Sequence, residues 1–217
     1  MTDVAPTPTP GPPAGPVEGH TEQGHDDHGH VTSTGISNEK LAMWVFLGSE
    51  CLLFGGLIST FILYRGNIIG DTELSDVFEI PFTSVSSFVL LMSSLTMVLA
   101  VTAIKRGDHR SMRTWLAVTA LMGTVFISGQ FYEFYEFAQV EGFGFTHSPA
   151  WSSFYALTGF HGVHVTVGIV MLISTLVLSL RGRIPTERAE AVEIVGLYWH
   201  FVDIVWILLF TIVYLIR

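Results

Sequence analysis

The sequence predicts an all-α integral membrane protein, a bundle of five transmembrane helices with its N-terminus in the cytoplasm and its C-terminus outside. Of its 217 residues, 49% are hydrophobic and only 13% are charged, a composition too apolar for a water-soluble domain of this length. In addition, five segments reach the roughly 20 mainly apolar residues that a helix needs to cross a hydrocarbon layer about 30 Å thick. Membrane insertion is therefore the first prediction.

The chain begins with a polar segment, residues 1–35, which is rich in Pro, Gly, Thr and Asp and has little that could form a core. We expect a disordered cytoplasmic tail here, followed by one transmembrane domain over 36–217. A cleavable signal peptide is not expected, because the segment lacks a basic start and an apolar core. The tail holds four histidines that could chelate metal adventitiously, although a polar tail without that role is favoured: His20, His25, His28 and His30.

The five predicted spans are too long for strands, and unsatisfied peptide groups in lipid leave the helix as the solution for a single segment. They cover residues 41–64, 82–104, 114–137, 151–180 and 194–216.

The orientation follows from the basic residues, which mark cytoplasmic loops. Lys and Arg occur between the second and third spans and between the fourth and fifth, at Lys105, Arg106, Arg110 and Arg113 and at Arg181, Arg183 and Arg188. The other two loops, 66–81 and 138–150, contain neither residue type. Five spans then place the tail inside and the C-terminus outside.

Several function classes are disfavoured by composition and motif content. The formal net charge is −9, and the acidic residues lie mostly in the tail and loops, so nucleic acid is not an expected partner. The single cysteine, Cys51, allows neither an internal disulfide nor a cysteine cluster for zinc or iron–sulfur. No phosphate-binding loop, nucleophile elbow or cytochrome attachment motif is found.

Glu50 is the first candidate functional residue. It lies nine residues after Leu41, about 14 Å along the first predicted helix and near the middle of the membrane. An ionisable group in hydrocarbon costs roughly 2.5 to 3.5 kcal/mol on insertion scales, and burial favours the neutral form of a carboxyl group. Glu50 could take part in proton transfer and react with a carbodiimide, or it could simply hydrogen-bond a facing helix.

A second group of candidates lies in the last two spans. His161 and His164 are three residues apart, and His200 and Asp203 repeat that spacing, so each pair shares a helix face. Three imidazoles and a carboxylate suit zinc, iron or copper in type and number. An interhelical hydrogen-bond network is favoured, because metal-binding histidine pairs on one helix are more often four residues apart. We expect His200 and Asp203 to form one charged or shared-proton pair.

The third predicted span ends in a polar and aromatic face. Gln130, Glu133 and Glu136 share one side of the helix and alternate with Phe and Tyr residues, a pattern typical of a membrane interface. Carboxyl groups that reach headgroups or outer loops are favoured here over a catalytic acid pair.

Four segments, in this order, resemble subunit III of the heme-copper respiratory oxidases. They are WVFLGSECLLFGGL (44–57), QFYEFYE (130–136), TGFHGVHVTVG (158–168) and YWHFVDIVWILLFTIVYL (198–215). The resemblance covers about residues 38–217 and leaves the tail unmatched.

This resemblance implies a non-redox accessory subunit of a bacterial cytoplasmic-membrane oxidase that reduces oxygen and translocates protons. The chain itself would hold no cofactor, metal or catalytic residue, since heme and copper belong to the partner subunits. Its expected partners are catalytic subunit I, subunit II and membrane lipids, with a small subunit IV and a respiratory supercomplex as further candidates. Its expected roles are support of proton uptake, protection of the catalytic subunit during turnover, and binding of phospholipid.

The resemblance also implies roles for individual residues. Glu50 matches the family's buried, carbodiimide-reactive glutamate. Six further residues match the family's internal polar network, which weakens the case for a metal site: Glu133, Glu136, His161, His164, His200 and Asp203.

The chain departs from many family members, which have seven spans, because it begins at what would be their third. The missing helix pair closes the lipid cleft in those members, while five-span forms are familiar among quinol oxidases. The segment 76–94 is similar to quinol oxidases, and the other motifs suit either type. Cytochrome c is favoured as electron donor because subunits of that class are commoner, with quinol as the alternative.

Two functions from other classes compete with the accessory subunit. One is a membrane metalloenzyme or metal transporter that uses His161, His164, His200 and Asp203, with the tail histidines delivering metal. The other is an assembly factor that is absent from the finished complex.

Overall fold

The computed structural model describes residues 37–65, 80–140, 145, 148–183 and 189–215. The predicted tail and the acidic first loop lie outside these ranges. The helices, in chain order, are α1 (Asn38–Arg65), α3 (Ile80–Lys105), α4 (His109–Tyr135), α5 (Pro149–Leu180) and α6 (Ala189–Phe210). Two short π-helical segments, η1 (Glu136–Val140) and η3 (Thr211–Leu215), continue α4 and α6.

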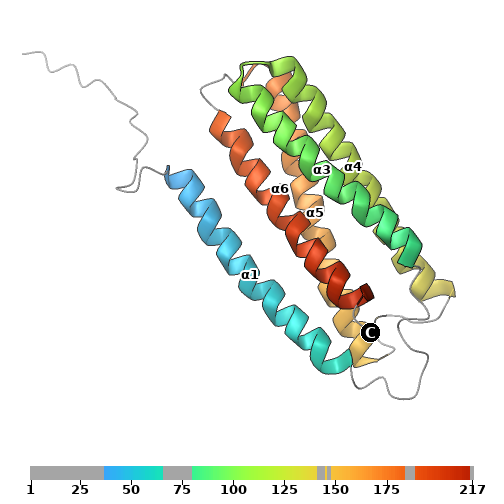
Figure 1. The fold of residues 1–217 in the computed structure, drawn as a ribbon. Helices are drawn as coiled ribbons and strands as arrows, with labels where there is room; N and C mark the ends of the chain where they lie inside the picture. The colour runs from blue at the N-terminus through green and yellow to red at the C-terminus, as the bar shows by residue number, and fades with distance from the viewer. Residues whose placement is uncertain (1–36, 66–79, 141–144, 146–147, 184–188, 216–217) are drawn as a thin grey trace, which may run out of the picture.

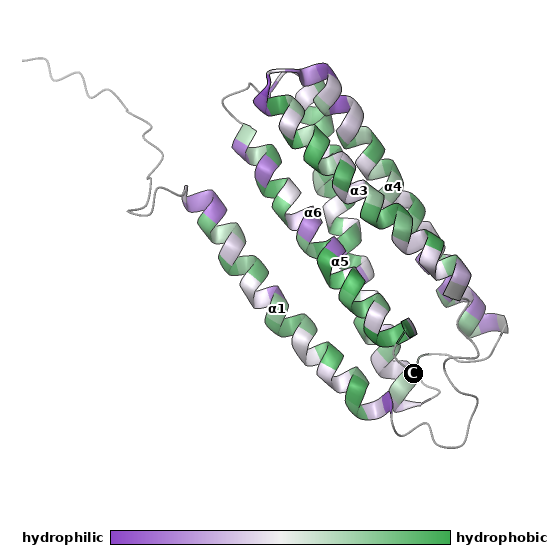
Figure 2. Cartoon of the chain, in the orientation of Figure 1, coloured by the Kyte–Doolittle hydropathy of each residue, from purple (hydrophilic) through white to green (hydrophobic). Residues whose placement is uncertain are grey.

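The predicted all-α architecture of five transmembrane helices is confirmed, since five helices in the described region are long and apolar enough to cross a membrane. Each begins and ends within a few residues of the predicted span. The sequence did not indicate the change from α to π geometry at Glu136 and Thr211, because apolar length does not distinguish the two. Hydrophobic residues predominate along the helices, and most of the strongly hydrophilic residues lie near the helix ends (Figure 2).

Four of the helices form a close group, and the fifth lies along its side (Figure 1). α3 packs against α4 and α6, and α4 also packs against α5, whereas α1 contacts α5 and α6. α1 buries only Leu47, Phe54 and Phe61, which are seven residues apart and so fall on one stripe of the helix. The rest of its surface is largely exposed and apolar, as is expected of a helix that faces lipid or another subunit.

The turn between α3 and α4 explains why these two helices run side by side in opposite directions. Gly107 has a φ of 76°, the left-handed conformation that glycine adopts without a steric penalty. Asp108 then caps α4, because its carboxylate accepts hydrogen bonds from the Ser111 amide at 3.0 Å and from the Ser111 hydroxyl at 2.6 Å. Such a cap satisfies a backbone donor that has no partner within the helix.

Trp199 holds the centre of the group together. A Cβ added at Gly123 of α4 would come within 2.5 Å of the Trp199 ring, and one added at Gly168 of α5 would come within 2.9 Å. The indole nitrogen donates to Ser93 Oγ of α3 at 3.0 Å. Glycine thus allows two helices to approach a large ring whose polar atom is tied to a third.

We expect Gly123→Ala to lower the stability of the protein by about 1–3 kcal/mol, because the added methyl group overpacks against a ring that its hydrogen bond holds in place. The measurement is thermal unfolding of the purified protein in detergent. Gly56→Ala in α1 is the matched control, since a Cβ there has no atom within 4 Å. Equal melting temperatures for Gly123→Ala and wild type would show that the Trp199 contact is loose.

The Asp108 cap predicts a dependence on pH. The hydrogen bonds from Ser111 hold the pKa of the Asp108 carboxyl below its ordinary value, so this stabilisation is complete above the ordinary carboxyl pKa of about 3.9 and is lost as the pH falls through the lowered value. Asp108→Asn keeps a capping oxygen without the charge. Its melting temperature should therefore fall less than that of wild type on acidification, and parallel curves would contradict the prediction.

Candidate polar sites within the helix bundle

Glu50 and His164 form a pair between α1 and α5. The Nε2 atom of His164 lies 3.2 Å from Glu50 Oε2, and both side chains are about 85% buried, with 15% of Glu50 and 14% of His164 exposed. The Phe54 ring packs against the His164 ring edge to face, with ring centroids 5.1 Å apart. A hydrogen bond to a facing helix was one of the two alternatives that the sequence left open for Glu50, and the sequence named no partner.

The second ring nitrogen of His164 fixes the proton arrangement of this pair. Nδ1 lies 2.8 Å from the Phe160 carbonyl oxygen, which can only accept, so Nδ1 carries a hydrogen. The contact with Glu50 then holds one more proton, placed either on the carboxyl group or on Nε2. Glu50 and His164 therefore form a shared-proton pair with two states. Both groups are neutral in one state, and a carboxylate faces an imidazolium in the other.

His161 has different surroundings although it is only one turn away on the same helix. It is fully buried, stacks on Trp206 with ring centroids 4.9 Å apart, and meets Phe54 and Phe126 edge to face. Neither of its ring nitrogens has a hydrogen-bond partner among the described residues. His161 therefore belongs to an aromatic cluster, and His164 to the Glu50 pair.

His200 and Asp203 are joined through Ser94 of α3. The Ser94 hydroxyl donates to Asp203 Oδ2 at 2.6 Å, and His200 Nδ1 lies 3.2 Å from the same hydroxyl oxygen. Because a hydroxyl has one hydrogen, His200 must be the donor in the second bond. The expected direct pair is thus replaced by a three-residue relay, and Asp203 Oδ1 is left buried without a partner within the described ranges.

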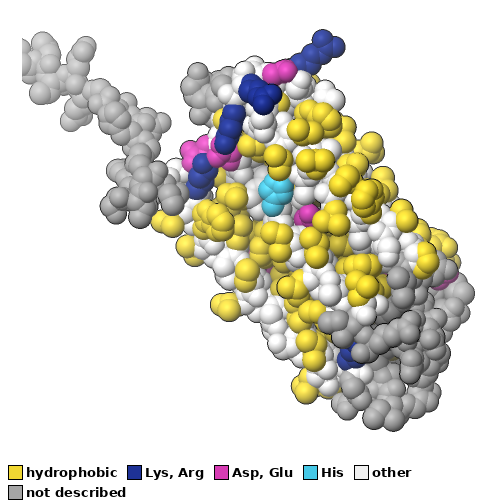
Figure 3. Space-filling view, viewed as in Figure 1, with side chains coloured by type: hydrophobic (Ala, Val, Ile, Leu, Met, Phe, Trp, Pro, Cys, Tyr) yellow, Lys and Arg dark blue, Asp and Glu magenta, His cyan; other side chains and the backbone are white. Residues whose placement is uncertain are grey.

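This relay begins at a cavity of about 480 Å³ between α1, α3 and α6, which His200 helps to line. An ion cluster lies on the same cavity wall: Glu193 contacts Lys40 at 2.5 Å and Lys105 at 2.8 Å. Figure 3 shows charged side chains gathered at one end of this face and a histidine exposed within the apolar surface below them. The cavity therefore connects the charged end of the bundle with the start of the relay.

The polar face of α4 turns inward at Glu133. Its Oε1 accepts hydrogen bonds from Thr83 and from Tyr214, both at 3.0 Å, while the neighbouring Tyr132 is exposed. The favoured interpretation from sequence, that this carboxyl group reaches headgroups, is therefore wrong for Glu133. Glu136 lies at the start of η1 and is half-buried.

The four candidate metal ligands do not converge. His164 turns to Glu50, His200 and Asp203 turn to Ser94, and His161 packs among aromatic rings. In the part of the chain that the structure describes, no three His, Cys, Asp or Glu side chains are placed to hold a metal ion. The tail histidines of the metal hypothesis lie outside that part.

Comparison with known proteins decides the family. Residues 20–216 match the family described as cytochrome c oxidase subunit III. The chain belongs to this family. It is a multi-pass bacterial membrane protein and a subunit III of a heme-copper oxidase, of either the cytochrome c or the quinol type, which implies association with the catalytic subunits.

Relatives of both types resemble this subunit III along most of its length. Cytochrome c oxidase subunit 3 of Alkalihalophilus pseudofirmus is 35% identical over 202 residues, which cover 93% of this chain and 97% of the relative. The Bacillus subtilis protein of the same name is also 35% identical, over 82% and 86% of the two chains. A probable quinol oxidase subunit 3 of Staphylococcus saprophyticus is 40% identical over 82% and 88%.

Sequence reasoning missed Ser94 and the ion cluster around Glu193. A signal for the first was present, because Ser87 and Ser94 are seven residues apart on the same helix and so fall on the same stripe. Ser87 accepts a hydrogen bond from Trp206 at 2.9 Å. Hydroxyl groups repeated on one face of a membrane helix therefore indicated the interior surface of α3.

We expect Ser94→Ala to lower stability by about 1–3 kcal/mol, because it removes the donor to a buried carboxyl group and the acceptor for His200. Ser94→Thr keeps the hydroxyl and should remain close to wild type. Thermal unfolding of the purified complex measures both. Ser59→Ala is the control, since that hydroxyl is exposed and bonds only its own helix at Gly55; a loss of the same size there would contradict a specific role for Ser94.

Proposed function

We propose that this subunit III is the non-redox accessory subunit of a bacterial cytochrome c oxidase, packed on catalytic subunit I in a complex that also holds subunit II. In this proposal heme and copper reside in the partner subunits, and the chain contributes proton uptake, stability during turnover and phospholipid binding. A small subunit IV and a respiratory supercomplex are further proposed partners. The N-terminus is proposed to lie in the cytoplasm, on the side of the basic loops.

The observation that carries the proposal is the Glu50–His164 pair. A buried carboxyl group 3.2 Å from an imidazole whose other nitrogen is already a donor holds one exchangeable proton. A proton can move between these two atoms without a large change of geometry, which is the property that a proton-holding group needs. Ionisable residues within spans are also functional by default, because they are costly to retain.

The His200–Ser94–Asp203 relay, which lies between α3 and α6, supports the same proposal. It combines one imidazole, one hydroxyl and one carboxyl group in hydrogen-bond contact, beside a cavity that reaches Lys40, Lys105 and Glu193. Such a chain can pass a proton by successive donor and acceptor exchange. We propose that Glu50, His164, His200 and Asp203 are proton-holding residues and that Glu133, Glu136 and His161 maintain the packing around them.

The quinol oxidase remains the second candidate, because a relative with that name is 40% identical over 82% of the chain. The two candidates differ in the other subunits of the complex, whereas the proposed role of subunit III is the same in both. An optical spectrum and subunit analysis of the purified complex distinguish them, since a subunit with a binuclear copper centre is expected for the cytochrome c type.

The test compares Glu50→Gln with Glu50→Ala in the purified oxidase. A glutamine can donate a hydrogen bond to neutral His164 Nε2, so it keeps the contact but cannot exchange the proton. We expect both variants to assemble and to begin oxygen reduction at nearly the wild-type rate, and both to lose activity several-fold faster during prolonged turnover. Oxygen consumption over time and proton uptake by the reconstituted complex are the measurements.

Glu39→Gln is the matched control, because it removes a carboxyl group from the exposed first turn of the same helix. It should behave as wild type throughout. If Glu50→Gln also matches wild type while Glu50→Ala does not, the pair has only a structural role. A chain that purifies without heme-bearing partners would refute the accessory-subunit proposal itself.

A further inference from the structure

The cavity between α1, α3 and α6 extends from the charged end of the bundle into its apolar part. Glu193 and Lys105 line it at the charged end, and His200 and Val98, each seven residues away on the same helix, line it further in. Seven residues are about two helical turns, so the members of each pair share a helix face and lie about 10 Å apart along the axis. The cavity therefore reaches beyond the ion cluster to the level of the relay.

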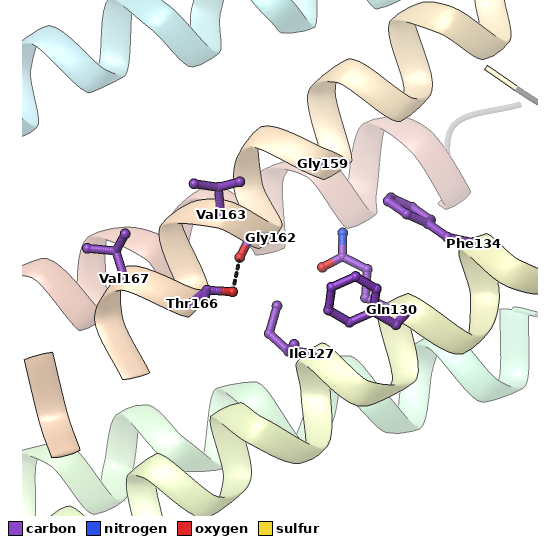
Figure 4. Close-up of a pocket in the computed structure, with 9 residues that line it drawn as sticks. Ile127, Gln130, Phe134, Gly159, Gly162, Val163, Thr166 and Val167 are labelled. Carbon is purple, nitrogen blue, oxygen red and sulfur yellow. Dashed lines mark hydrogen bonds between the residues drawn. The ribbon is translucent and has the colours of Figure 1, made fainter. Parts of the chain in front are cut away.

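The walls of this cavity are polar enough to hold water. Five of the ten residues that line it carry a charge, a hydroxyl group or an imidazole: Lys40, Thr102, Lys105, Glu193 and His200. Among the described residues, no charged side chain lines a second cavity of about 290 Å³ between α4 and α5, whose walls are mainly aliphatic and phenyl groups (Figure 4). Apolar cavities stay dry, whereas a cavity with several polar partners and more than roughly 10–15 Å³ holds water. The two cavities are therefore expected to differ in hydration.

His200 presents an acceptor without a partner to the polar cavity. Its Nδ1 is the donor to Ser94, so in the neutral imidazole Nε2 is the acceptor. Nε2 has no hydrogen-bond partner among the described residues and is not fully buried, so a molecule in the cavity can reach it. A hydrocarbon chain at this position would leave Nε2 unpaired at a cost of about 1–3 kcal/mol, whereas water can donate to it.

We propose that this cavity is a water-filled inlet through which protons reach His200 Nε2 from the charged end of the bundle, an inference that rests on the proposed role of His200 and Asp203 in holding protons. A hydrated proton binds to Nε2, the hydrogen on Nδ1 passes to Ser94 Oγ, and the Ser94 hydroxyl hydrogen passes to Asp203 Oδ2. An ionised Asp203 thereby becomes neutral. His200 stays neutral with its hydrogen on Nε2, and Ser94 keeps one hydrogen.

The inlet serves a proton store rather than a channel. Asp203 Oδ1 is buried and has no partner among the described residues, so within that part of the chain the relay ends at this carboxyl group. A proton taken up there leaves by the same route. Lys40 of α1 and Lys105 of α3 both contact Glu193 of α6, which fixes the three helices that wall the inlet to one another at its charged end.

Cysteine modification tests the inlet, because methanethiosulfonates react with the thiolate, and a cysteine forms its thiolate only where it can release a proton to water. The purified oxidase in lipid nanodiscs, with Cys51→Ser in this subunit, is treated with a small sulfonate-bearing methanethiosulfonate, and the mass of the subunit is followed. Val98→Cys lines the inlet and Leu99→Cys does not, although the native side chains are similarly exposed, at 47% and 37%. We expect Val98→Cys to react about tenfold faster, since thiolates form in water and not in hydrocarbon.

His200→Cys places a thiol at the inner end of the inlet and should react as Val98→Cys does. Val167→Cys in the apolar cavity between α4 and α5 should react as slowly as Leu99→Cys (Figure 4). Equal rates for Val98→Cys and Leu99→Cys would overturn the proposal, because lipid or a neighbouring subunit would then fill the cavity, or water would reach the whole surface. An unreactive His200→Cys would also overturn it, since water would stop short of the relay. Neither result alters the Glu50 test, so the inlet can fail while the accessory role stands.

Discussion

The structure depends on one constraint, which is that a polar group inside hydrocarbon is costly unless it has a partner within the protein. Helices satisfy the backbone, and several Ser and Thr hydroxyls satisfy themselves by donating to a carbonyl one turn earlier, as Ser59 does to Gly55 and Thr175 to Met171. The buried indole groups of Trp199 and Trp206 are bonded to serines of α3. The interior of the bundle is thus organised by hydrogen bonds between helices, surrounded by apolar packing.

Glycines and aromatic rings determine how closely the helices pack, and so whether these hydrogen bonds between helices can form. Trp199 reaches Ser93 only because Gly123 and Gly168 leave room for its ring. Trp206 extends the same interior surface, since it bonds Ser87, stacks on His161 and meets Phe126 edge to face at 4.7 Å. Polar and aromatic contacts therefore fix the same helix rotations.

Hydropathy was sufficient to predict the spans, because the length and apolar content of 41–64 or 151–180 leave few alternatives. It was not sufficient for the pairing of Glu50 with His164, since the rotation of a helix about its axis depends on packing with neighbours far away in the sequence. The same limit explains Glu133, which shares its helix end with exposed tyrosines yet faces Thr83 and Tyr214. The resemblance to subunit III predicted one polar network that included His161, whereas the hydrogen bonds of Ser94 and the aromatic surroundings of His161 required coordinates.

The stripe of Leu47, Phe54 and Phe61 is the main apolar attachment of α1 to the rest of the bundle. Glu50 is carried on this helix, whereas His164 belongs to the tightly packed group. A rotation of α1 about this stripe would lengthen the contact between Glu50 and His164. It would leave the packing of Trp199 unchanged. Pressure on the outer face of α1, from lipid or from a neighbouring subunit, would therefore change the distance between Glu50 and His164 before it changed the packing of the other four helices.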